Sequence, residues 1–352
     1  MSRKTMVVIG ATGVIGRRLI EHLEPLKDWE VVAVSRRAPD FATRAWHLPV
    51  DLSDPEDCAA KFAGLAEATH VVYAAYSDRP NWAEQRAPNA AMFRNALTAL
   101  DKACPALRSV VLLQGTKYYG SHLGPFKTPA FEDDPRHMPP NFYFDQQDTM
   151  TALSRGRPWH WTALRPHTVC GFTFGMPMNL VPVIACYAVI SKELGLPLRW
   201  PGKPAAYDKL FMVTDADLLS RSILWAAEAE TAANEAFNVT NGDFFRWCHL
   251  FPRIADYFDM PCGDPAPIKL ADFMADKEEL WADICDRHGL DKQPLSRLVL
   301  WRFGDYIFNQ DWDIMSHTTK IRQAGFGECI ESGKMFMTWF DELRQRRIIP
   351  GA

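Results

Sequence analysis

Short apolar runs alternate with amphipathic stretches over the first 240 residues of the chain. Runs of this kind, rich in β-branched residues and bounded by polar positions, are typical of strands in a buried sheet. Seven are predicted strands: residues 5–9, 29–34, a segment that ends at 50, then 69–76, 109–114, 161–166 and 235–240. Strands that alternate with helices predict a parallel, doubly wound α/β sheet with right-handed crossovers. Ligands of such sheets bind beyond the carboxyl ends of the strands.

The alternation weakens from about residue 171 onward. Residues 176–196 predict an apolar helix with proline interruptions, and its core at 180–190 is well short of the ~20 residues that span a bilayer. Residues 268–340 carry Trp, Phe and Met at helical spacing, which is more typical of a core than of ligand contacts. We predict a sheet domain of residues 1–170 plus about 205–242, and a smaller, mostly helical lobe of about 171–204 and 243–352 that roofs the cleft.

The first predicted strand runs directly into the loop G-A-T-G-V-I-G and then into a helix. Gly10 makes the tight turn, Gly13 lets the backbone approach a pyrophosphate, and Gly16 lets helix and strand pack closely. The helix N-terminus presents free N–H groups and a positive dipole end to the phosphates. This placement predicts a Rossmann-like dinucleotide site that also includes Thr12, Val14 and Ile15. A plain strand–helix turn is the alternative.

The end of the second strand bears on the choice of dinucleotide. A site that prefers NAD would place an acidic residue there to bind the ribose 2′-hydroxyl. This chain has Ser35, Arg36 and Arg37 instead. The guanidinium fork suits a phosphate, so the sequence predicts NADP(H) rather than NAD(H), with two solvated surface arginines as the alternative.

The ends of the third and fourth strands complete the predicted cofactor site. Asp51 and Leu52 follow the third strand, where the carboxylate would accept a hydrogen bond from the adenine amino group. Alternatively, Ser53 or Asp54 caps the helix that begins near Pro55. Small residues at the end of the fourth strand, Ala74 and Ala75, let a cofactor lie close.

The candidate chemistry lies on two segments near the fifth strand. Q-G-T-K-Y-Y at 114–119 follows that strand, and N-F-Y-F at 141–144 follows a proline-rich loop. Reductases of this architecture usually carry Tyr-x-x-x-Lys, which puts phenol and ammonium on one helix face. Here residue 147 is Gln, so that pair is missing. From these residues alone, the alternative remains open that Tyr143 is a core aromatic residue and Lys117 a surface cation.

Together with G-P-F at 124–126, these two motifs resemble the progesterone 5β-reductase/iridoid synthase-like family of short-chain dehydrogenases/reductases. The resemblance covers nearly the whole chain. It includes the glycine loop, the Ser-Arg-Arg segment, M-F-R-N at 92–95, R-P at 165–166, M-N-L at 178–180, D-A-D-L at 215–218, the segment 234–243 and W-x-F-G-D at 301–305.

The resemblance implies roles for individual residues. Lys117 and Tyr143 match the family's catalytic pair, while Phe144 replaces a second tyrosine of the motif. The family's tryptophan after the fourth strand corresponds to Tyr76, so the pocket wall differs. The implied cofactor contacts add Gln114, Tyr143, Pro166, Thr168 and Val169. The implied substrate contacts are Tyr76, Phe126, Asn179 and Phe211.

The resemblance also implies an NADPH-dependent ene-reductase that acts on a small hydrophobic enone or enal and forms a homodimer. Hydride adds to the β-carbon, and a hydrogen-bond donor stabilises the enolate oxygen. Tyr143 is the expected donor, with Lys117 in support. A carbonyl reductase or epimerase on the same fold is one alternative, and a non-catalytic NADP(H)-sensing protein is another.

Composition narrows the remaining classes. The formal net charge of −4 gives no general attraction to nucleic acid or anionic membrane. The eight cysteines include no C-x-x-C, and no H-E-x-x-H, G-x-S-x-G or P-loop motif occurs. We therefore expect no metal site, disulfide framework or serine hydrolase. The apolar run at 6–9 is too short for a signal-peptide core, so we expect a cytoplasmic protein with reduced thiols.

Overall fold

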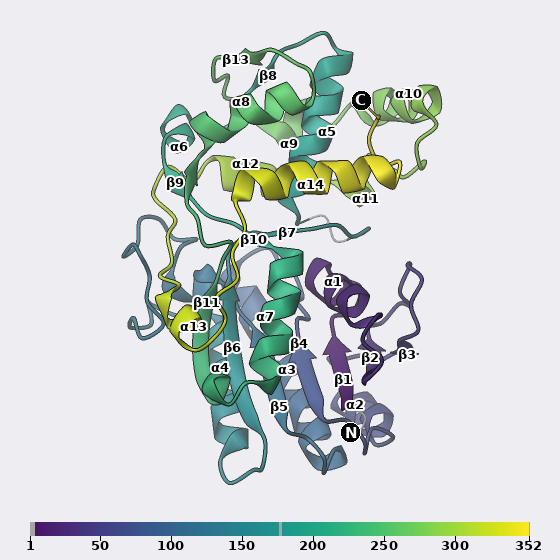
Figure 1. Ribbon diagram of the computed structural model, residues 1–352, viewed down its shortest axis with the longest axis vertical. Helices are drawn as coiled ribbons and strands as arrows, with labels where there is room; N and C mark the ends of the chain where they lie inside the picture. Colours follow the sequence, from purple (N-terminus) through teal and green to yellow (C-terminus); the bar gives the residue numbers. More distant parts are fainter. Residues whose placement is uncertain (1–3, 176–177, 352) are drawn as a thin grey trace.

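The computed structural model describes residues 4–175 and 178–351. At its centre lies a parallel seven-stranded sheet in the order β11-β6-β5-β4-β1-β2-β3, with the arrowheads pointing toward a layer of helices (Figure 1). The strands are β1 (Lys4–Ile9), β2 (Trp29–Val34), β3 (Trp46–Leu48), β4 (His70–Tyr73), β5 (Ser109–Leu113), β6 (His160–Pro166) and β11 (Glu235–Val239). This confirms the doubly wound sheet and all seven predicted strands. The third ends two residues earlier than predicted, and the fourth is shorter at both ends.

Helices cover both faces of the sheet. They are α1 (Val14–Leu23) and α7 (Ala216–Glu228) on one face, and α2 (Pro55–Phe62), α3 (Trp82–Ala103) and α4 (Phe142–Ser154) on the other. Successive side chains of β1 alternate between the two, because a strand's side chains point to opposite faces. Met6 and Val8 pack with α1 and α7, whereas Val7 and Ile9 pack with α2 and α3.

A mostly helical layer lies beyond the carboxyl edge of the sheet, at the top of Figure 1. Its helices are α5 (Leu180–Glu193), α6 (Pro204–Tyr207), α8 (Trp247–Tyr257), α9 (Leu270–Phe273), α10 (Glu278–His288), α11 (Leu295–Leu298), α12 (Trp301–Phe308) and α14 (Ser332–Gln345). Short elements complete the chain: 3-10 helices η1 (Thr116–Tyr119) and η2 (Glu230–Ala232), α13 (Thr319–Gln323), and strands β7 (Val169–Cys170), β8 (Leu198–Arg199), β9 (Leu210–Phe211), β10 (Thr214–Asp215), β12 (Phe245–Arg246) and β13 (Cys262–Gly263).

The helical layer has its own aromatic core, which includes predicted residues of 268–340 such as Phe308 and also residues outside that range. Trp200 packs edge-on against Phe251 and Phe308, and Trp247 lies beside it. Helix α5 is buried on all sides from Leu180 to Ser191. It begins later than the predicted 176, and Met176 and Pro177 lie outside the described residues. The boundaries of the two predicted parts stay a prediction.

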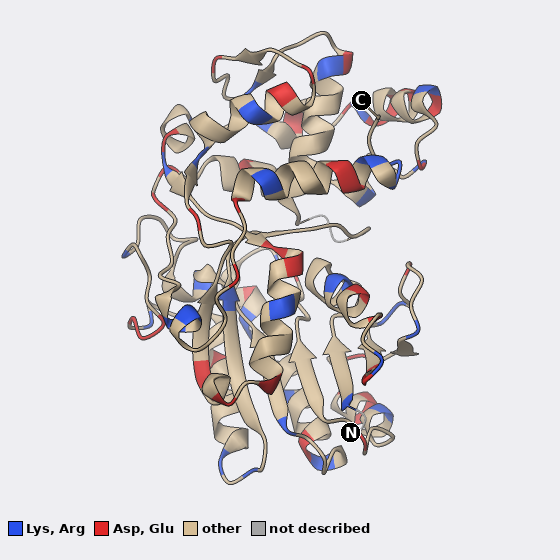
Figure 2. Cartoon of the chain, in the orientation of Figure 1, with Lys and Arg blue, Asp and Glu red and all other residues tan. Residues whose placement is uncertain are grey.

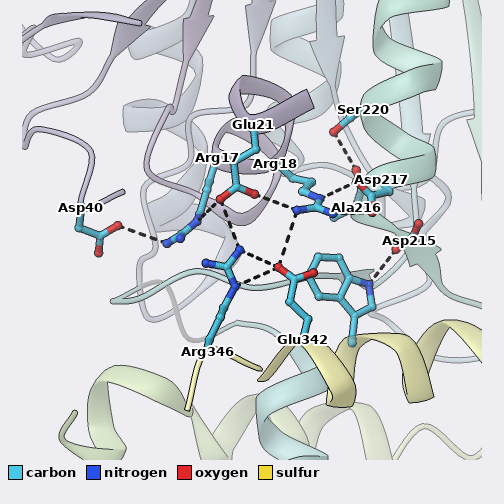
Figure 3. Close-up of polar contacts among 11 residues, drawn as sticks. Arg17, Arg18, Glu21, Asp40, Asp215, Ala216, Asp217, Ser220, Glu342 and Arg346 are labelled. Carbon is cyan, nitrogen blue, oxygen red and sulfur yellow. Dashed lines mark hydrogen bonds and ion pairs between the residues drawn. The ribbon is translucent and has the colours of Figure 1, made fainter. Parts of the chain in front are cut away.

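An ionic network joins the two layers beside the glycine loop (Figure 3). Arg18 of α1 binds Asp217 of α7 through Nη2 at 2.7 Å and lies 3.7 Å from Glu342 of α14. Arg346, just after α14, pairs with Glu342 at 2.7 Å. The indole N–H of Trp339 donates to Asp215 at 2.8 Å. The network therefore fixes α14 against α1, which follows the glycine loop, and against α7.

Other surface features are unexceptional. Charged residues of both signs are interspersed over the helices and loops (Figure 2). All eight cysteines are free, and five of them are buried. Within residues 4–175 and 178–351, every helix is too short or too polar to cross a bilayer. The same residues contain no group of three or more His, Cys, Asp and Glu placed to hold a metal ion.

Candidate active site

A first cavity opens along the carboxyl ends of β1, β2, β3 and β4 and has a volume of about 230 Å³. It brings together residues predicted to bind the cofactor from four separate segments: Gly10, Thr12, Gly13, Ser35, Arg36, Arg37, Asp51, Leu52, Ala74 and Ala75. The sheet topology explains why these segments meet, because the carboxyl ends of parallel strands lie at the same edge of the sheet. We call this space the outer cavity.

Two glycines give the outer cavity its shape. Gly10 has φ +92°, and a Cβ there would lie 2.8 Å from the backbone of Ala74 and Ala75. A Cβ at Gly16 would lie 2.3 Å from the Gly10 carbonyl oxygen, so α1 packs directly on the turn. A side chain at either position would collide with backbone, so the two glycines let the turn, the end of β4 and α1 pack closely beside the outer cavity. This close packing is what a pyrophosphate-binding turn requires.

The far end of the outer cavity is polar. Arg36 and Arg37 are exposed and form no ion pair among the described residues. The Asp51 carboxylate accepts hydrogen bonds from the Ser53 backbone and hydroxyl, which lowers the pKa of Asp51. Asp54 accepts from the backbone N–H groups of Glu56 and Asp57, so it caps α2, as one of the two sequence interpretations held. The arrangement leaves both guanidiniums available for an anionic group.

A second cavity of about 240 Å³ continues from the outer cavity toward the helical layer. Both predicted catalytic residues line it, together with further predicted residues: Gly13, Val14, Ile15, Ala74, Ala75, Tyr76, Gln114, Thr168 and Val169. The remaining wall comes from side chains that the sequence did not identify: Trp82, Leu113, Phe142, Gln146, Met178 and Phe303. This central cavity is mainly apolar, which suits a ring system or a hydrophobic ligand.

Two polar side chains tie the catalytic segments together. Asn141 caps α4 by accepting from the Tyr143 backbone N–H at 3.0 Å, while its amide donates to the Lys117 carbonyl at 2.8 Å. The Gln114 amide donates to the Tyr143 carbonyl at 3.0 Å. Lys117 lies in η1, immediately after β5. The distance between the two segments is thus set by hydrogen bonds rather than by one helix.

We expect Asn141→Ala to reduce turnover about tenfold, because small displacements of reacting groups are costly. It should also lower the free energy of unfolding by about 1 kcal/mol through loss of the cap. Asp54→Ala, which removes the cap of α2, is the matched control and should show only the stability loss. Steady-state kinetics and chemical denaturation measure both effects. Equal turnover of the two variants would contradict a positioning role for Asn141.

Burial shifts the pKa values of the two candidate catalytic residues in opposite directions. It raises the pKa of the Tyr143 phenol well above its usual range, so the phenol keeps its proton at neutral pH. It lowers the pKa of the Lys117 ammonium, which lies 5.0 Å from the ring centre of Trp82 and 5.5 Å from that of Tyr306. Aromatic faces stabilise a cation in such surroundings. The site therefore combines a protonated donor with a desolvated cation.

Gln147 stands at the position where a Tyr-x-x-x-Lys motif would place a lysine, and it has another role here. Gln147 accepts from the Gln114 amide at 3.3 Å and from the buried Arg165 guanidinium at 3.1 Å. Arg165 also donates to the Tyr119 hydroxyl at 2.8 Å, and its guanidinium lies 3.5 Å from the ring centre of Tyr118. Gln147 thus belongs to a buried hydrogen-bond network with Gln114 and Arg165.

A third space, the inner cavity of about 150 Å³, adjoins the central one. Lys117 and Tyr143 line both. The other predicted contact residues in its wall are Ile15, Gln114, Pro166, Thr168 and Val169. The wall also includes Gly115, Thr116, Ser121, His167, Phe303, Tyr306 and Ile307.

Three predicted substrate contacts lie outside these cavities. Asn179 is fully buried, caps α5 through the Val181 N–H and donates to the Gly171 carbonyl. Phe211 is packed against His167 and Trp247. Phe126 packs beside the cluster of Tyr118, Tyr119, Ala130 and Phe144. Tyr76 does line the outer and central cavities, and its hydroxyl donates to Asp78 at 3.0 Å.

The pocket wall contains a tryptophan that the sequence analysis did not identify. Trp82, at the start of α3, stacks on Phe142 at 5.8 Å and lines the central cavity. The sequence marks the start of this helix with Asn81, which precedes Trp82 and caps α3. The replacement at Tyr76 therefore does not leave the wall without an indole.

Comparison with known proteins gives one family. A family model described as a PRISE-like Rossmann-fold domain matches residues 53–350. An (S)-8-oxocitronellyl enol synthase of Nepeta racemosa is 34% identical and a 3-oxo-Δ(4,5)-steroid 5β-reductase of Arabidopsis thaliana 33% identical. Each alignment covers 98% of this chain and 92% of the relative. An NAD-bound short-chain dehydrogenase/reductase superfamily protein of Agrobacterium tumefaciens has a TM-score of 0.67 at 14% identity, over 98% of both chains.

Proposed function

Because the chain belongs to the PRISE-like Rossmann-fold family, as its sequence motifs predicted, we propose that it is an NADPH-dependent reductase of activated C=C bonds. The observation that carries the proposal is the pair of Lys117 and Tyr143 in the wall of one apolar cavity that continues from a glycine-lined cradle. Its substrates are small, hydrophobic enones or enals, and the active form is a homodimer.

The cofactor fits the continuous outer and central cavities. The Gly10–Gly16 loop and the start of α1 bind the pyrophosphate, and Arg36 and Arg37 bind the 2′-phosphate. Ala74 and Ala75 line both cavities, whereas Thr168 and Val169 line the central cavity but not the outer one, and the central cavity holds the nicotinamide end. When bound, the reduced nicotinamide supplies a hydride.

The protein's part is to stabilise the charge that develops on the substrate. As hydride reaches the β-carbon, electron density moves onto the carbonyl oxygen, and a preorganised donor there stabilises the transition state more than the ground state. Tyr143 donates that hydrogen bond and keeps its proton, since burial raises its pKa. Lys117 adds positive charge beside the same oxygen. Solvent supplies the proton for the α-carbon.

Two observations weigh against the alternatives. Carbonyl reduction and epimerisation on this fold normally use Tyr-x-x-x-Lys, and Gln147 here holds Arg165 instead. A protein that only senses NADP(H) would have no need for a desolvated ammonium and a phenol in one cavity.

The test is product analysis after reaction of NADPH with 2-cyclohexen-1-one and with bulkier enones and enals. We expect NADPH oxidation with loss of the conjugated chromophore and retention of the carbonyl. An allylic alcohol as the product would instead identify a carbonyl reductase, and the absence of any oxidation across the panel would contradict the proposed activity.

We expect the double variant Arg36→Ala/Arg37→Ala to bind NADPH about 10²- to 10⁴-fold more weakly, because each of the two lost charge-assisted hydrogen bonds is worth about 1.5–3 kcal/mol. NADH affinity should change little, since NADH has no 2′-phosphate. Fluorescence titration with both nucleotides measures the effect, and Arg94→Ala, an exposed arginine of α3, is the control. Equal losses for the two nucleotides would contradict the assigned phosphate contact.

A further inference from the structure

The loop between β4 and α3 places an arginine in the wall of the outer cavity. Arg79 lies in this β4–α3 loop, residues 74–81, and its side chain is exposed. The guanidinium donates to the Asp78 carbonyl oxygen at 3.3 Å. It has no ion pair within the part of the chain that the structure describes. The charge of Arg79 is therefore available to a ligand in the outer cavity.

Two buried amides of α3 hold the β4–α3 loop in place. The Asn89 side chain accepts from the Ser77 backbone N–H and donates to the Ser77 carbonyl oxygen, both at 2.8 Å. The Gln85 amide donates to the Arg79 carbonyl oxygen at 2.9 Å and to the Asp78 carboxylate at 3.3 Å. Asn89 is fully buried, and Gln85 is 7% exposed. The backbone of Arg79 is therefore ordered before a ligand binds, which reduces the entropy cost of binding.

The β4–α3 loop lies where the outer and central cavities meet. Tyr76 lines both cavities, whereas Arg79 lines the outer cavity but not the central one. Asp78 lies close enough to Lys117 of the central cavity to act on its charge. Burial lowers the pKa of Lys117, and the Asp78 carboxylate opposes that shift. Arg79 therefore belongs to a stretch of chain that borders both cavities.

The same loop starts beside the glycine turn. A Cβ at Gly10 would lie 2.8 Å from the backbone of Ala74 and Ala75, the first residues of the loop. The turn, residues 10–16, offers backbone N–H groups to a phosphate but contains no charged side chain. The two arginines that follow it in α1 pair with carboxylates. A charged partner for a pyrophosphate at this turn must therefore come from another segment.

The charged residues of the outer cavity divide between two places. They are Arg36, Arg37, Asp51 and Arg79. Arg36 and Arg37 follow β2, on the side assigned to the 2′-phosphate, whereas Arg79 follows β4 and borders the central cavity. The pyrophosphate joins the adenosine and nicotinamide halves of a dinucleotide. It therefore lies at the boundary between the cavities when each half occupies one of them.

We propose that the Arg79 guanidinium binds the pyrophosphate of the cofactor and supplies the positive charge that the glycine turn lacks. The inference deepens the proposed function and rests on its cofactor site. A guanidinium suits this place because its planar fork of donors matches the geometry of phosphate oxygens. NADPH and NADH share the pyrophosphate, so Arg79 contributes to the affinity for both, whereas Arg36 and Arg37 contribute to the affinity for NADPH.

Three nucleotides separate these contacts, and none of the measurements needs turnover. NADPH, NADH and 2′-AMP, which has the 2′-phosphate but no pyrophosphate, are titrated by calorimetry. We expect Arg79→Ala to weaken NADPH and NADH binding by the same factor, about tenfold or more, and to leave 2′-AMP binding unchanged. Arg79→Lys should recover part of the loss, since it keeps the charge but not the fork.

Two further variants serve as controls for Arg79→Ala. Arg36→Ala/Arg37→Ala should give the opposite pattern, with weaker binding of NADPH and 2′-AMP and unchanged binding of NADH. Arg94→Ala removes an exposed arginine of α3 that lines neither the outer nor the central cavity, and it should match the wild type with all three nucleotides.

Other results would overturn the assignment. A loss of 2′-AMP affinity in Arg79→Ala would place the guanidinium at the adenosine half, and unchanged binding of all three nucleotides would exclude any contact. A crystal structure of the wild type with NADP+ decides the contact without a variant: we expect a guanidinium nitrogen about 2.7–2.9 Å from a pyrophosphate oxygen. If the wild type bound NADPH but reduced no enone, the proposed function would fail, while the titrations would still decide the role of Arg79.

Discussion

Tyr143→Phe should lose about 10²- to 10³-fold in turnover number with an enone substrate, because one donor to a developing oxyanion is worth about 2.7–4 kcal/mol. The substitution removes only the hydroxyl, and the ring keeps its contact with Phe142. NADPH affinity should stay at the wild-type value, because the backbone of Tyr143, held by Asn141 and Gln114, is unchanged. Stopped-flow measurement of the hydride-transfer step and NADPH titration give the two values.

Tyr73→Phe is the matched control for this change. Tyr73 is buried in β4, and its hydroxyl has no hydrogen-bond partner among the described residues. The same loss of one oxygen should therefore leave turnover intact and make the protein no less stable. If Tyr143→Phe retained full ene-reduction while Tyr73→Phe did the same, the phenol of Tyr143 would have no part in the chemistry.

The sheet and the nucleotide cradle could be predicted from the sequence because both depend on local patterns. Continuous apolar runs specify buried parallel strands, and the spacing of Gly10, Gly13 and Gly16 specifies a turn that leads into a helix. The fourth strand was predicted too long because residues 74–76 are as apolar as a strand, although they leave the ladder after Tyr73. Two of the three, Ala74 and Ala75, line the outer and central cavities.

The substrate side of the site could not be predicted in the same way. Apolar periodicity shows that a residue is buried, but not whether it is buried against protein or against a cavity. Phe211 and Phe303 look alike in sequence, yet only Phe303 lines the central and inner cavities. Asn179 is used as a helix cap, a role that a motif alone does not distinguish from ligand binding.

Trp82 was missed for a related reason. Its partners, Lys117 and Phe142, come from segments distant in sequence. Its place in the cavity wall depends on how the start of α3 approaches those segments. The resemblance identified Lys117 and Tyr143 because each of them lies in a short motif of consecutive residues.

Burial of the charged Lys117 ammonium lowers the free energy of unfolding. Its pKa is lower in the folded protein than in the unfolded chain, because burial disfavours the charged form. Between these two pKa values the unfolded chain binds more protons, so stability rises with pH through that window. Below the folded-state pKa the full penalty is present, and part of it remains up to the pKa of the unfolded chain. The site thus retains a charge that opposes folding, which is typical of residues kept for function.

Lys117→Met should therefore be more stable than the wild type at neutral pH, and its advantage should shrink as the pH approaches 10.5, the ordinary lysine value. Turnover should fall by about 10²-fold, since a charge beside the developing oxyanion is lost. The wild-type rate should also decline with rising pH as Lys117 loses its proton, at a pH below the ordinary lysine pKa, and this decline should be absent in the variant. Lys127→Met, at an exposed lysine, controls for the substitution itself. Thermal unfolding and turnover, both measured across pH 6–11, test these expectations. If the variant were less stable than the wild type at neutral pH, Lys117 would be held by interactions stronger than the cost of its desolvation.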